Sequence, residues 1–519
     1  MRTGGRTSTQ SRSRRLAVAC TAVVCISAAL CGCGWRSAMY EEIGSARRVA
    51  YERWAAGEGA DEVRISGELS LTDAVKLALL HNKPLRAALE QREIGRGRVV
   101  GAYSEALPSV QGTASYTHLD EVATFSFQGR EISTGELDNY SAGLEIRQPL
   151  YRGGAIGAAI RAAQLFYLRT DEEVRGQVQR TIYEVARNYF DVLLARRLEA
   201  VNREAVVSAR TQLEDVRAKL RRGAAYPYDV LRAEVELSNF RAEEIQQRNR
   251  ANLAKTRLLK TMGVSQRAEV TLSDELGYEP VKPVLEEAVR IAHTNRPDLY
   301  LAELDVRLQR EALRIARSRY WPDVDAIFTN TWARPDPHTT LPNWGHEWVA
   351  SVEMRWPIFD GLEREGRIIE ERARLRQQRI ALADAEERTL LEIRQAMLSL
   401  RDAEEFVESQ RMNLERAEEG LRLAEVGYRE GVNTEVEVVD ARAALTRARG
   451  LYYEAVYGHT LARLDLQRAM GILGPGAGER GATDDVEVRP AHVTQFGEDA
   501  EVRPGPATRP ARPEETQSP

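Results

Sequence analysis

Two short stretches hold the residues whose types and spacing suggest chemistry. All four cysteines of the chain lie near the N-terminus, at Cys20, Cys25, Cys31 and Cys33. Towards the other end, Glu437 and Asp440 are three residues apart, which puts both carboxylates on one face of a helix. Like charges at short range repel unless they are protonated or bridged by cations. The first stretch therefore suggests a modified cysteine, and the second suggests a site that favours cations.

Enzyme chemistry has little support in this sequence. The histidines show none of the paired spacings of a zinc site, and they are scattered over His81, His118, His293, His338, His346, His459 and His492. The sequence has no phosphate-binding loop, nucleophile elbow or redox cysteine pair. We expect no catalytic residue, no metal and no cofactor. The net charge of -5, from 73 basic and 78 acidic residues, gives no basic excess that would favour nucleic acid as a partner.

The N-terminus has the pattern of an export signal. Three basic residues, Arg12, Arg14 and Arg15, precede an apolar run over residues 16–30. The run ends in Leu30-Cys31-Gly32-Cys33, which resembles a bacterial lipobox. We predict that residues 1–32 are a lipoprotein signal peptide and that Cys33 becomes the first mature residue and carries the lipid. The alternative is an ordinary signal peptide with incidental cysteines; in either case the mature chain cannot form an internal disulfide.

The rest of the chain is an internal duplication. Pro149 and Pro357 differ by 208 in residue number, as do Gly223 and Gly431, and Gly263 and Gly471. We expect one repeat over residues 69–264 and a second over 286–473, joined by a linker over 265–285. We expect a tether over 33–68, and a disordered tail over 474–519, which is rich in Gly, Pro and charged residues.

Four segments alternate between apolar and polar residues with period two, the pattern of a half-buried strand. They lie at about 109–119, 138–148, 322–332 and 346–356. About ten residues is the length that a tilted strand needs to cross a bilayer. Trp348 and Trp356 lie at the two ends of the fourth segment, as in an aromatic girdle at each membrane interface. The alternative from these segments alone is a soluble sandwich sheet with one wet face.

Long helices separate and follow these strands. Apolar residues recur every three or four positions, as in a coiled-coil seam, at Val178, Ile182, Val185, Tyr189 and Val192. Some 65 residues of helix make a rod of roughly 100 Å, far longer than a globular core requires. Beyond the signal, no stretch approaches the roughly 18 to 20 uncharged apolar residues of a spanning helix. If this chain crosses a membrane, its strands must do so.

Each long helix ends at a tip and returns as a shorter helix. At the first tip, Gly223 suits a left-handed C-cap and Pro227 suits the first turn of the next helix. At the second tip, Gly431 stands at the equivalent position, and Thr434 with Glu437 forms a possible capping box.

With these motifs in this order, the chain resembles the TolC-like outer-membrane factors, the exit ducts of tripartite efflux pumps and type I secretion systems. The resemblance covers about residues 69–473. It rests on the duplication, on the strand-to-helix junctions QPLYRGG at Pro149 and WPIFDGL at Pro357, and on the tip sequences RRGAAYPYDVLRAEVEL and YREGVNTEVEVVDARAAL. The lipobox is similar to that of the acylated, OprM-like members.

The resemblance implies a mostly helical homotrimer with a membrane β-barrel. Each chain would give four strands to a 12-stranded barrel, and long coiled-coil helices would form a tunnel in the periplasm. Lipid of the outer membrane, a periplasmic adaptor protein and an inner-membrane RND or ABC transporter are the implied partners. The expected function is a passive conduit from the periplasm to the exterior. The alternative is an exported coiled-coil scaffold of the envelope without channel activity.

The resemblance also assigns roles at the tips. In TolC-like ducts, acidic residues at the positions of Glu437 and Asp440 ring the constricted entrance, and a Tyr to Asp contact between neighbouring tips latches the closed state. Tyr428 and Asp229 could reproduce that contact. The tips around Gly223 and Gly431 are expected to dock the adaptor.

Local structure offers a plainer alternative for each of these residues. Glu437 can complete a capping box, Asp440 can be a solvated acid in the first turn of its helix, and the two glycines can be C-caps only.

Overall fold

The computed structural model describes residues 39–53, 55, 65–127, 130–134, 136–339 and 342–474. The predicted signal peptide (residues 1–32), Cys33 and the tail from residue 475 onward lie outside these residues. Within the expected tether, residues 39–53 form a helix. This segment contains no proline and only one glycine, Gly44, so nothing in it opposes helix formation strongly.

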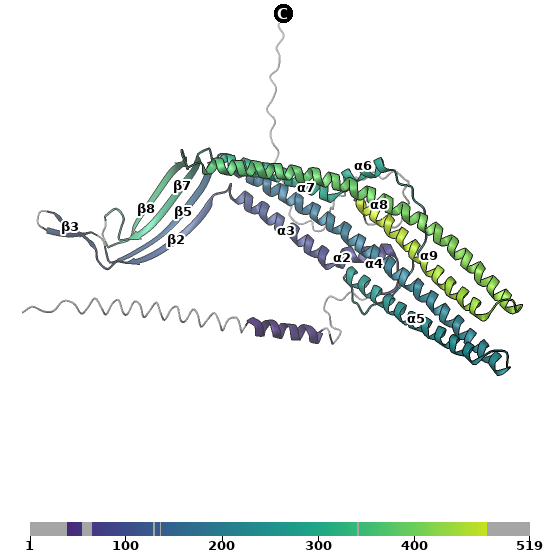
Figure 1. Cartoon of the computed structure of the whole chain (residues 1–519). Coiled ribbons are helices and arrows are strands. Elements are labelled where there is room, and N and C mark those ends of the chain that lie inside the picture. The colour runs from purple at the N-terminus through teal and green to yellow at the C-terminus, as the bar shows by residue number, and fades with distance from the viewer. Residues whose placement is uncertain are drawn as a thin grey trace, which may run out of the picture. The chain divides into compact units, whose positions relative to one another are not determined.

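Eight helices of the described chain form two equivalent sets of four (Figure 1). The first set is α2 (Leu71–His81), α3 (Lys83–Ser104), α4 (Ala155–Arg221) and α5 (Pro227–Met262). The second set is α6 (Leu285–Asn295), α7 (Pro297–Ser318), α8 (Glu363–Arg429) and α9 (Glu435–Ala469). Both α4 and α8 have 67 residues, which corresponds to roughly 100 Å at 1.5 Å per residue. None of the described helices combines the length and apolar composition needed to cross a bilayer.

The helix ends follow from the sequence. The Ser70 side chain accepts a hydrogen bond from the backbone N–H of Asp73 and so caps the start of α2. Pro227 begins α5 and Pro297 begins α7, where a missing N–H costs nothing. Gly263, which follows α5, has φ of +77°, a conformation that glycine adopts readily. A Cβ at this position would lie 2.2 Å from the carbonyl oxygen of His81, so glycine also permits the close approach of α5 and α2.

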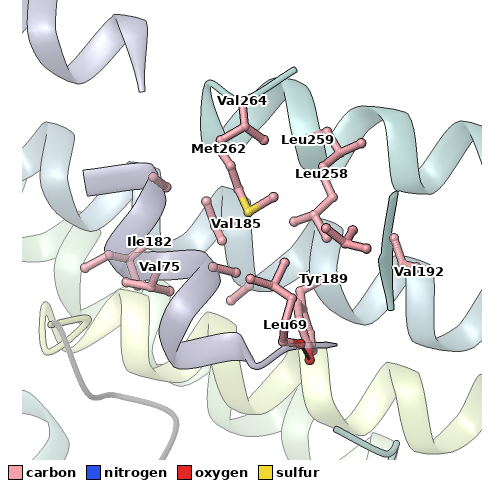
Figure 2. Close-up of a cluster of buried hydrophobic side chains, with 14 of the residues drawn as sticks. Leu69, Val75, Ile182, Val185, Tyr189, Val192, Leu258, Leu259, Met262 and Val264 are labelled. Carbon is pink, nitrogen blue, oxygen red and sulfur yellow. Dashed lines mark hydrogen bonds between the residues drawn. The ribbon is translucent and has the colours of Figure 1, made fainter. Parts of the chain in front are cut away.

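The main core lies where α4 packs against α2 and α5 (Figure 2). The predicted seam of α4 is confirmed, because Ile182, Val185, Tyr189 and Val192 are buried and Val178 is partly buried against the same cluster. They pack in one cluster with residues of α5 such as Leu258, Leu259 and Met262, and with Ala74, Val75 and Ala78 of α2. A second cluster joins α8 to α6 and α9 through Ala288, Ala292, Ile393, Ala396, Leu400, Ala462, Leu466 and Ala469.

One buried hydroxyl links this core to the middle of the linker, at Asp274. The Tyr189 hydroxyl lies 2.9 Å from the carbonyl oxygen of Leu69 and 2.7 Å from Oδ2 of Asp274. The same carboxylate oxygen accepts the backbone N–H of Leu71 at 2.8 Å. Burial raises the pKa of the Tyr189 hydroxyl, which therefore stays protonated and donates.

We expect Tyr189→Phe to lower the free energy of unfolding by about 1–2 kcal/mol, because a buried hydrogen bond to a carboxylate is lost without a change of shape. Chemical denaturation followed by circular dichroism measures the effect. Tyr228→Phe is the matched control, since the Tyr228 side chain is 70% exposed. An equal change in both variants would contradict this role for Tyr189.

A short parallel pair was not predicted from the sequence. Strand β1 (Ser66–Leu69) pairs with β6 (Glu269–Leu272), which lies inside the expected linker. The two strands have four residues each and are about 200 positions apart in the chain, so no local period reveals them.

Four longer strands form one antiparallel sheet in the order β2-β5-β7-β8. Their bounds are Ser109–His118 for β2, Asp138–Arg152 for β5, Asp323–Arg334 for β7 and Gly345–Arg355 for β8. The connection between β2 and β5 also carries a hairpin of β3 (Ala123–Phe127) and β4 (Arg130–Thr134). The prediction of a mostly helical, internally duplicated fold with four antiparallel strands is confirmed.

Candidate functional site

The register of the sheet gathers the apolar side chains on one face. Val110 lies opposite Ile146, Ile146 opposite Phe328, and Phe328 opposite Ala350. Directly paired residues share a face, and faces alternate along each strand. One face of the sheet therefore holds the apolar sets of all four strands: Val110, Gly112, Ala114, Tyr116, Tyr140, Ala142, Leu144, Ile146, Val324, Ala326, Phe328, Trp332, Ala350, Val352 and Met354. Such a face suits contact with lipid.

Aromatic side chains lie towards both ends of this face. Tyr140 has its ring centroid 5.1 Å from that of Tyr116 and 6.3 Å from that of Trp344. Trp356 directly follows β8 and donates from its indole nitrogen to the carbonyl oxygen of Tyr320 at 3.1 Å. The eight residue steps from Trp348 to Trp356 correspond to about 27 Å of extended chain, close to the height of about 25 Å of a lipid-facing apolar band.

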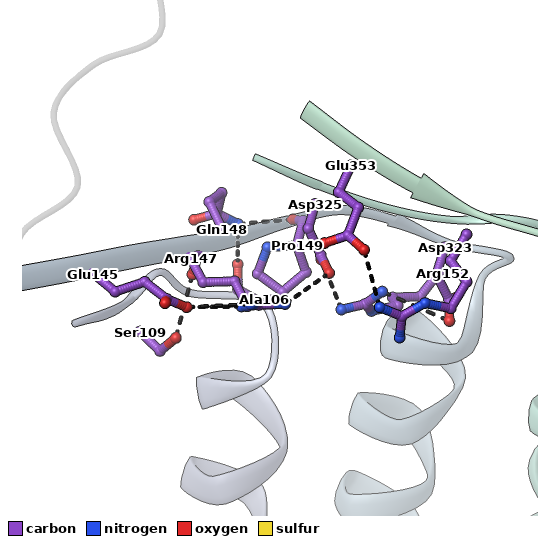
Figure 3. A network of polar contacts seen from close by, with 11 residues as sticks. Ala106, Ser109, Glu145, Arg147, Gln148, Pro149, Arg152, Asp323, Asp325 and Glu353 are labelled. Carbon is purple, nitrogen blue, oxygen red and sulfur yellow. Dashed lines mark hydrogen bonds and ion pairs between the residues drawn. The ribbon is translucent and has the colours of Figure 1, made fainter. Parts of the chain in front are cut away.

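The opposite face of the sheet is polar and carries a network of charges near the helices (Figure 3). Asp325 lies 2.7 Å from Arg152 and 3.6 Å from Arg147, and Arg147 also contacts Glu145 at 3.2 Å. The two pairs with Asp325 join the last part of β5 to the first part of β7, and they therefore connect the two repeats.

The two predicted strand-to-helix junctions lie beside this network. Strand β5 continues past Pro149 to Arg152, with an irregular register between Pro149 and Tyr151. Proline lacks the N–H that a regular ladder requires, which explains the irregularity. At the second junction, β8 ends at Arg355 and Pro357 follows it. The first junction turns at Gly153, where a Cβ would lie 2.4 Å from the carbonyl oxygen of Ser318, so only glycine fits.

The far ends of the long helices form the two tips. Gly223 has φ of +74° and Gly431 has φ of +76°, the left-handed conformation that glycine adopts at the end of a helix. A Cβ at either glycine would meet no atom within 4 Å. The backbone at both tips therefore favours glycine, while the space beside each one is open within this chain.

The acidic residues predicted at the tips have different surroundings. Glu437 is exposed, and its carboxylate accepts the backbone N–H of Thr434 at 2.9 Å, so it has the role of a cap. The carboxylate of Asp229 accepts the N–H of Tyr226 at 2.8 Å in the equivalent way. Asp440 is 71% exposed in its side chain and lies 3.6 Å from Arg232 of α5.

Tyr428 has a partner that the sequence did not suggest. The Nζ atom of Lys219, in α4, hydrogen-bonds the Tyr428 hydroxyl and lies 4.0 Å from the ring centroid. A Tyr428 to Asp229 contact between neighbouring tips stays a prediction.

Further polar contacts join the two hairpins near the tips. The side chain of Gln212 in α4 donates to Glu435 at 2.9 Å and accepts from Arg442 at 3.0 Å. Sequence reasoning did not predict these contacts, nor those made by Lys219 and Arg232. The only signal was the divergence of the repeats at Arg232 and Asp440, which occupy equivalent positions 208 apart.

Glu236 adds a third charge beside Arg232 and Asp440. Burial raises the pKa of Glu236, Arg232 lowers it by a smaller amount, and Asp440 raises it. A raised pKa in the folded state means that stability falls as the pH rises from the ordinary glutamate value through the folded value.

We therefore expect Glu236→Gln to raise the unfolding temperature at neutral pH and to leave it unchanged below about pH 4, where the unfolded chain is protonated too. Thermal unfolding of parent and variant over this pH range measures the difference. Glu243→Gln, on the same helix, is the control. A pH-independent difference would contradict a charge effect at Glu236.

The part of the chain that the structure describes contains no candidate metal site. No group of three or more His, Cys, Asp or Glu side chains there is arranged to hold a metal ion.

Comparisons with known proteins agree with this architecture. The family model described as outer membrane efflux protein matches residues 74–264 and 288–472, one segment in each repeat. Protein CyaE of Bordetella pertussis is 25% identical over 423 residues, covering 80% of this chain and 85% of the relative. The alkaline protease secretion protein AprF of Pseudomonas aeruginosa is 22% identical, covering 78% of this chain and 85% of the relative.

Among solved structures, the CmeC outer membrane channel of Campylobacter jejuni has the same fold. Its TM-score is 0.67 at 16% identity, and the match covers 77% of this chain and 85% of CmeC. Since the family model covers both repeats, this chain belongs to the outer membrane efflux protein family, and it functions as an outer-membrane exit duct for efflux or secretion.

Proposed function

We propose that the protein works as a homotrimer whose sheets close into one membrane barrel. The observation that carries the proposal is a sheet with one apolar face that ends at β2 on one side and at β8 on the other. An open sheet edge cannot be left in lipid, because its backbone groups have no water to bond. A sheet of four strands is too narrow to close on itself, whereas three chains supply 12 strands. The long helices would then continue the barrel as a tunnel in the periplasm.

The proposed duct is passive and has no enzymatic activity of its own. Its substrate would come from an inner-membrane transporter of the RND or ABC type through a periplasmic adaptor protein. The open space beside Gly223 and Gly431 supports docking of the adaptor at the tips. The exposed carboxylates of Glu437 and Asp440 support an acidic ring of six such groups at the entrance of the trimer.

An ion pair within each chain reduces the negative charge of this acidic ring. Arg232 lies beside Asp440, so it offsets part of that negative charge, whereas Glu437 caps its helix and has no ion pair in the described part of the chain. Glu437 is therefore the stronger contributor to a cation-favouring entrance.

Cys33 is proposed to carry a lipid that anchors the mature N-terminus in the outer membrane. We expect labelling by a radioactive fatty acid to be lost in Cys33→Ser and kept in Cys31→Ser. The opposite pattern would refute the assignment of the modified cysteine. Trimers of Cys33→Ser should still assemble, since the barrel anchors them without the lipid.

An exported coiled-coil scaffold is the alternative, and the sheet separates the two functions. Fractionation of cells followed by electrophoresis without boiling tests the choice. The duct predicts an SDS-resistant trimer in the outer-membrane fraction. A protein recovered only as a monomer in the soluble periplasmic fraction would favour the scaffold.

A further inference from the structure

The two outer strands of the sheet have an unused hydrogen-bonding edge. In the described part of the chain, β2 pairs only with β5, and β8 pairs only with β7. Every residue of β2 is exposed, and so is every residue of β8 from Trp348 to Arg355. These two edges would meet in the proposed trimer, β8 of one protomer against β2 of the next.

The internal duplication fixes the register of the two hairpins. Adding 214 to the residue numbers of β2 and 208 to those of β5 converts the first hairpin into the second. Ser109 opposite Arg147 becomes Asp323 opposite Arg355, and both pairs are present. The same holds at the other end, where Tyr116 opposite Tyr140 becomes Asn330 opposite Trp348. The repeats are thus equivalent in strand register as well as in sequence.

The pairing of β5 with β7 is a template for the pairing of β8 with β2 of the neighbouring protomer. Strand β5 is the second long strand of the first repeat, and it pairs with β7, which is the first long strand of the second repeat. In a closed barrel, β8 and the β2 strand of the neighbouring protomer have this same relation. The template pairs Glu145 with Thr329. Applying the two offsets, 145 plus 208 and 329 minus 214, gives Glu353 and Ser115.

We propose that Glu353 of each protomer lies opposite Ser115 of the partner subunit in the assembled barrel. The inference rests on the proposed trimer and specifies its seam. The same register places Ser351 opposite Thr117 of the partner subunit and Arg355 opposite Thr113 of the partner subunit.

The pattern of side chains agrees with this register. Val352 then lies opposite Tyr116 of the partner subunit, and Met354 opposite Ala114 of the partner subunit, so the apolar faces of both sheets continue across the seam. A slip by one residue would place the apolar face of one sheet on the same side as the polar face of its neighbour. Polar residues would then face lipid, which is unfavourable. A slip by two residues keeps the faces aligned, so the experiment must distinguish the register from its two-residue neighbours.

Engineered disulfides make this distinction. Directly opposite residues of antiparallel strands have Cα atoms about 4.5–5.5 Å apart, within the range of about 4.4–6.8 Å that a disulfide spans. A slip by two residues moves the strands by about 7 Å and puts the pair out of reach. Cysteines introduced in the strands are free of internal competitors, because the natural cysteines all lie within residues 20–33. The Glu353 side chain contacts Arg355 at 3.0 Å near the strand end, and it is 46% exposed, so its replacement should be tolerated.

The test uses the full-length protein with Glu353→Cys and Ser115→Cys, oxidised in isolated outer membranes and boiled in SDS without reductant. We expect covalent trimers. The slipped combinations, Glu353→Cys with Thr113→Cys and Glu353→Cys with Thr117→Cys, should remain monomers. Glu145→Cys with Thr329→Cys is the positive control, since the structure places this pair opposite within one chain. If the first variant assembles poorly, Ser351→Cys with Thr117→Cys tests the same register.

Each contrary result has a defined meaning. Covalent trimers in a slipped combination and not in the proposed one would overturn the register while leaving the trimer intact. Absence of an SDS-resistant trimer from the unmodified protein would overturn the proposed assembly, and the register with it.

Discussion

A bulky side chain at either tip is expected to stop export while leaving the protein assembled in the outer membrane. The left-handed conformation of Gly223 and Gly431 costs a non-glycine residue about 1–2 kcal/mol, too little to unfold helices of this length. The space beside both glycines is open within the chain, so Gly223→Trp or Gly431→Trp creates no internal clash. The new side chain instead projects from the surface proposed to receive the adaptor.

Export should fall to the level of a strain that lacks the protein, measured as drug sensitivity or as the amount of exported polypeptide. Gly223→Asn and Gly431→Asn are matched controls, since asparagine tolerates the left-handed conformation with a small side chain. Gly420→Trp, on α8 and also facing open space, tests whether bulk elsewhere on the helix has the same effect. Normal export in both tip variants would count against docking at the tips.

Removal of the acidic charges at the second tip is expected to abolish the preference of the channel for cations. The combined change Glu437→Gln and Asp440→Asn removes six negative charges from a trimer and keeps an oxygen that can accept the Thr434 N–H. Block by a multivalent cation should then require at least about tenfold more of that cation, which corresponds to about 1.4 kcal/mol of binding free energy. Conductance of purified trimers in planar bilayers measures both properties.

Single variants separate charge from capping. Glu437→Ala removes both the charge and the cap, whereas Glu437→Gln removes the charge alone. Arg232→Ala should change selectivity in the other direction, because it frees the carboxylate of Asp440. If the charge-removing pair keeps the selectivity and the block of the parent, Glu437 is a helix cap and Asp440 a solvated acid, with no part in a gate.

The sequence predicted the sheet well because its signals are local. Period-two alternation located β2, β5, β7 and β8, and the register then placed their apolar residues on one face. The prediction missed the extension of β5 from residue 148 to Arg152, since a proline inside a strand is a strong stop signal unless a bulge accommodates it. It also missed β1 and β6, whose pairing depends on the packing of distant segments.

The tip residues were identified by position, but their partners were not. The sequence singled out Tyr428 and Asp440, and the structure pairs them with Lys219 and Arg232 of the other repeat. These contacts require the two hairpins to lie side by side, which follows from the packing of α4 against α9 and from no local pattern. Glu437 shows the reverse case, because its cap depends on neighbours in sequence and was predictable.

Ion conductance of the purified full-length protein tests the central claim most directly. A duct predicts discrete conductance steps when SDS-resistant trimers insert into a planar bilayer, with a preference for cations in the parent protein. Trimers that insert but pass no current, both in the parent and in the Glu437→Gln, Asp440→Asn variant, would contradict the assignment as an exit duct.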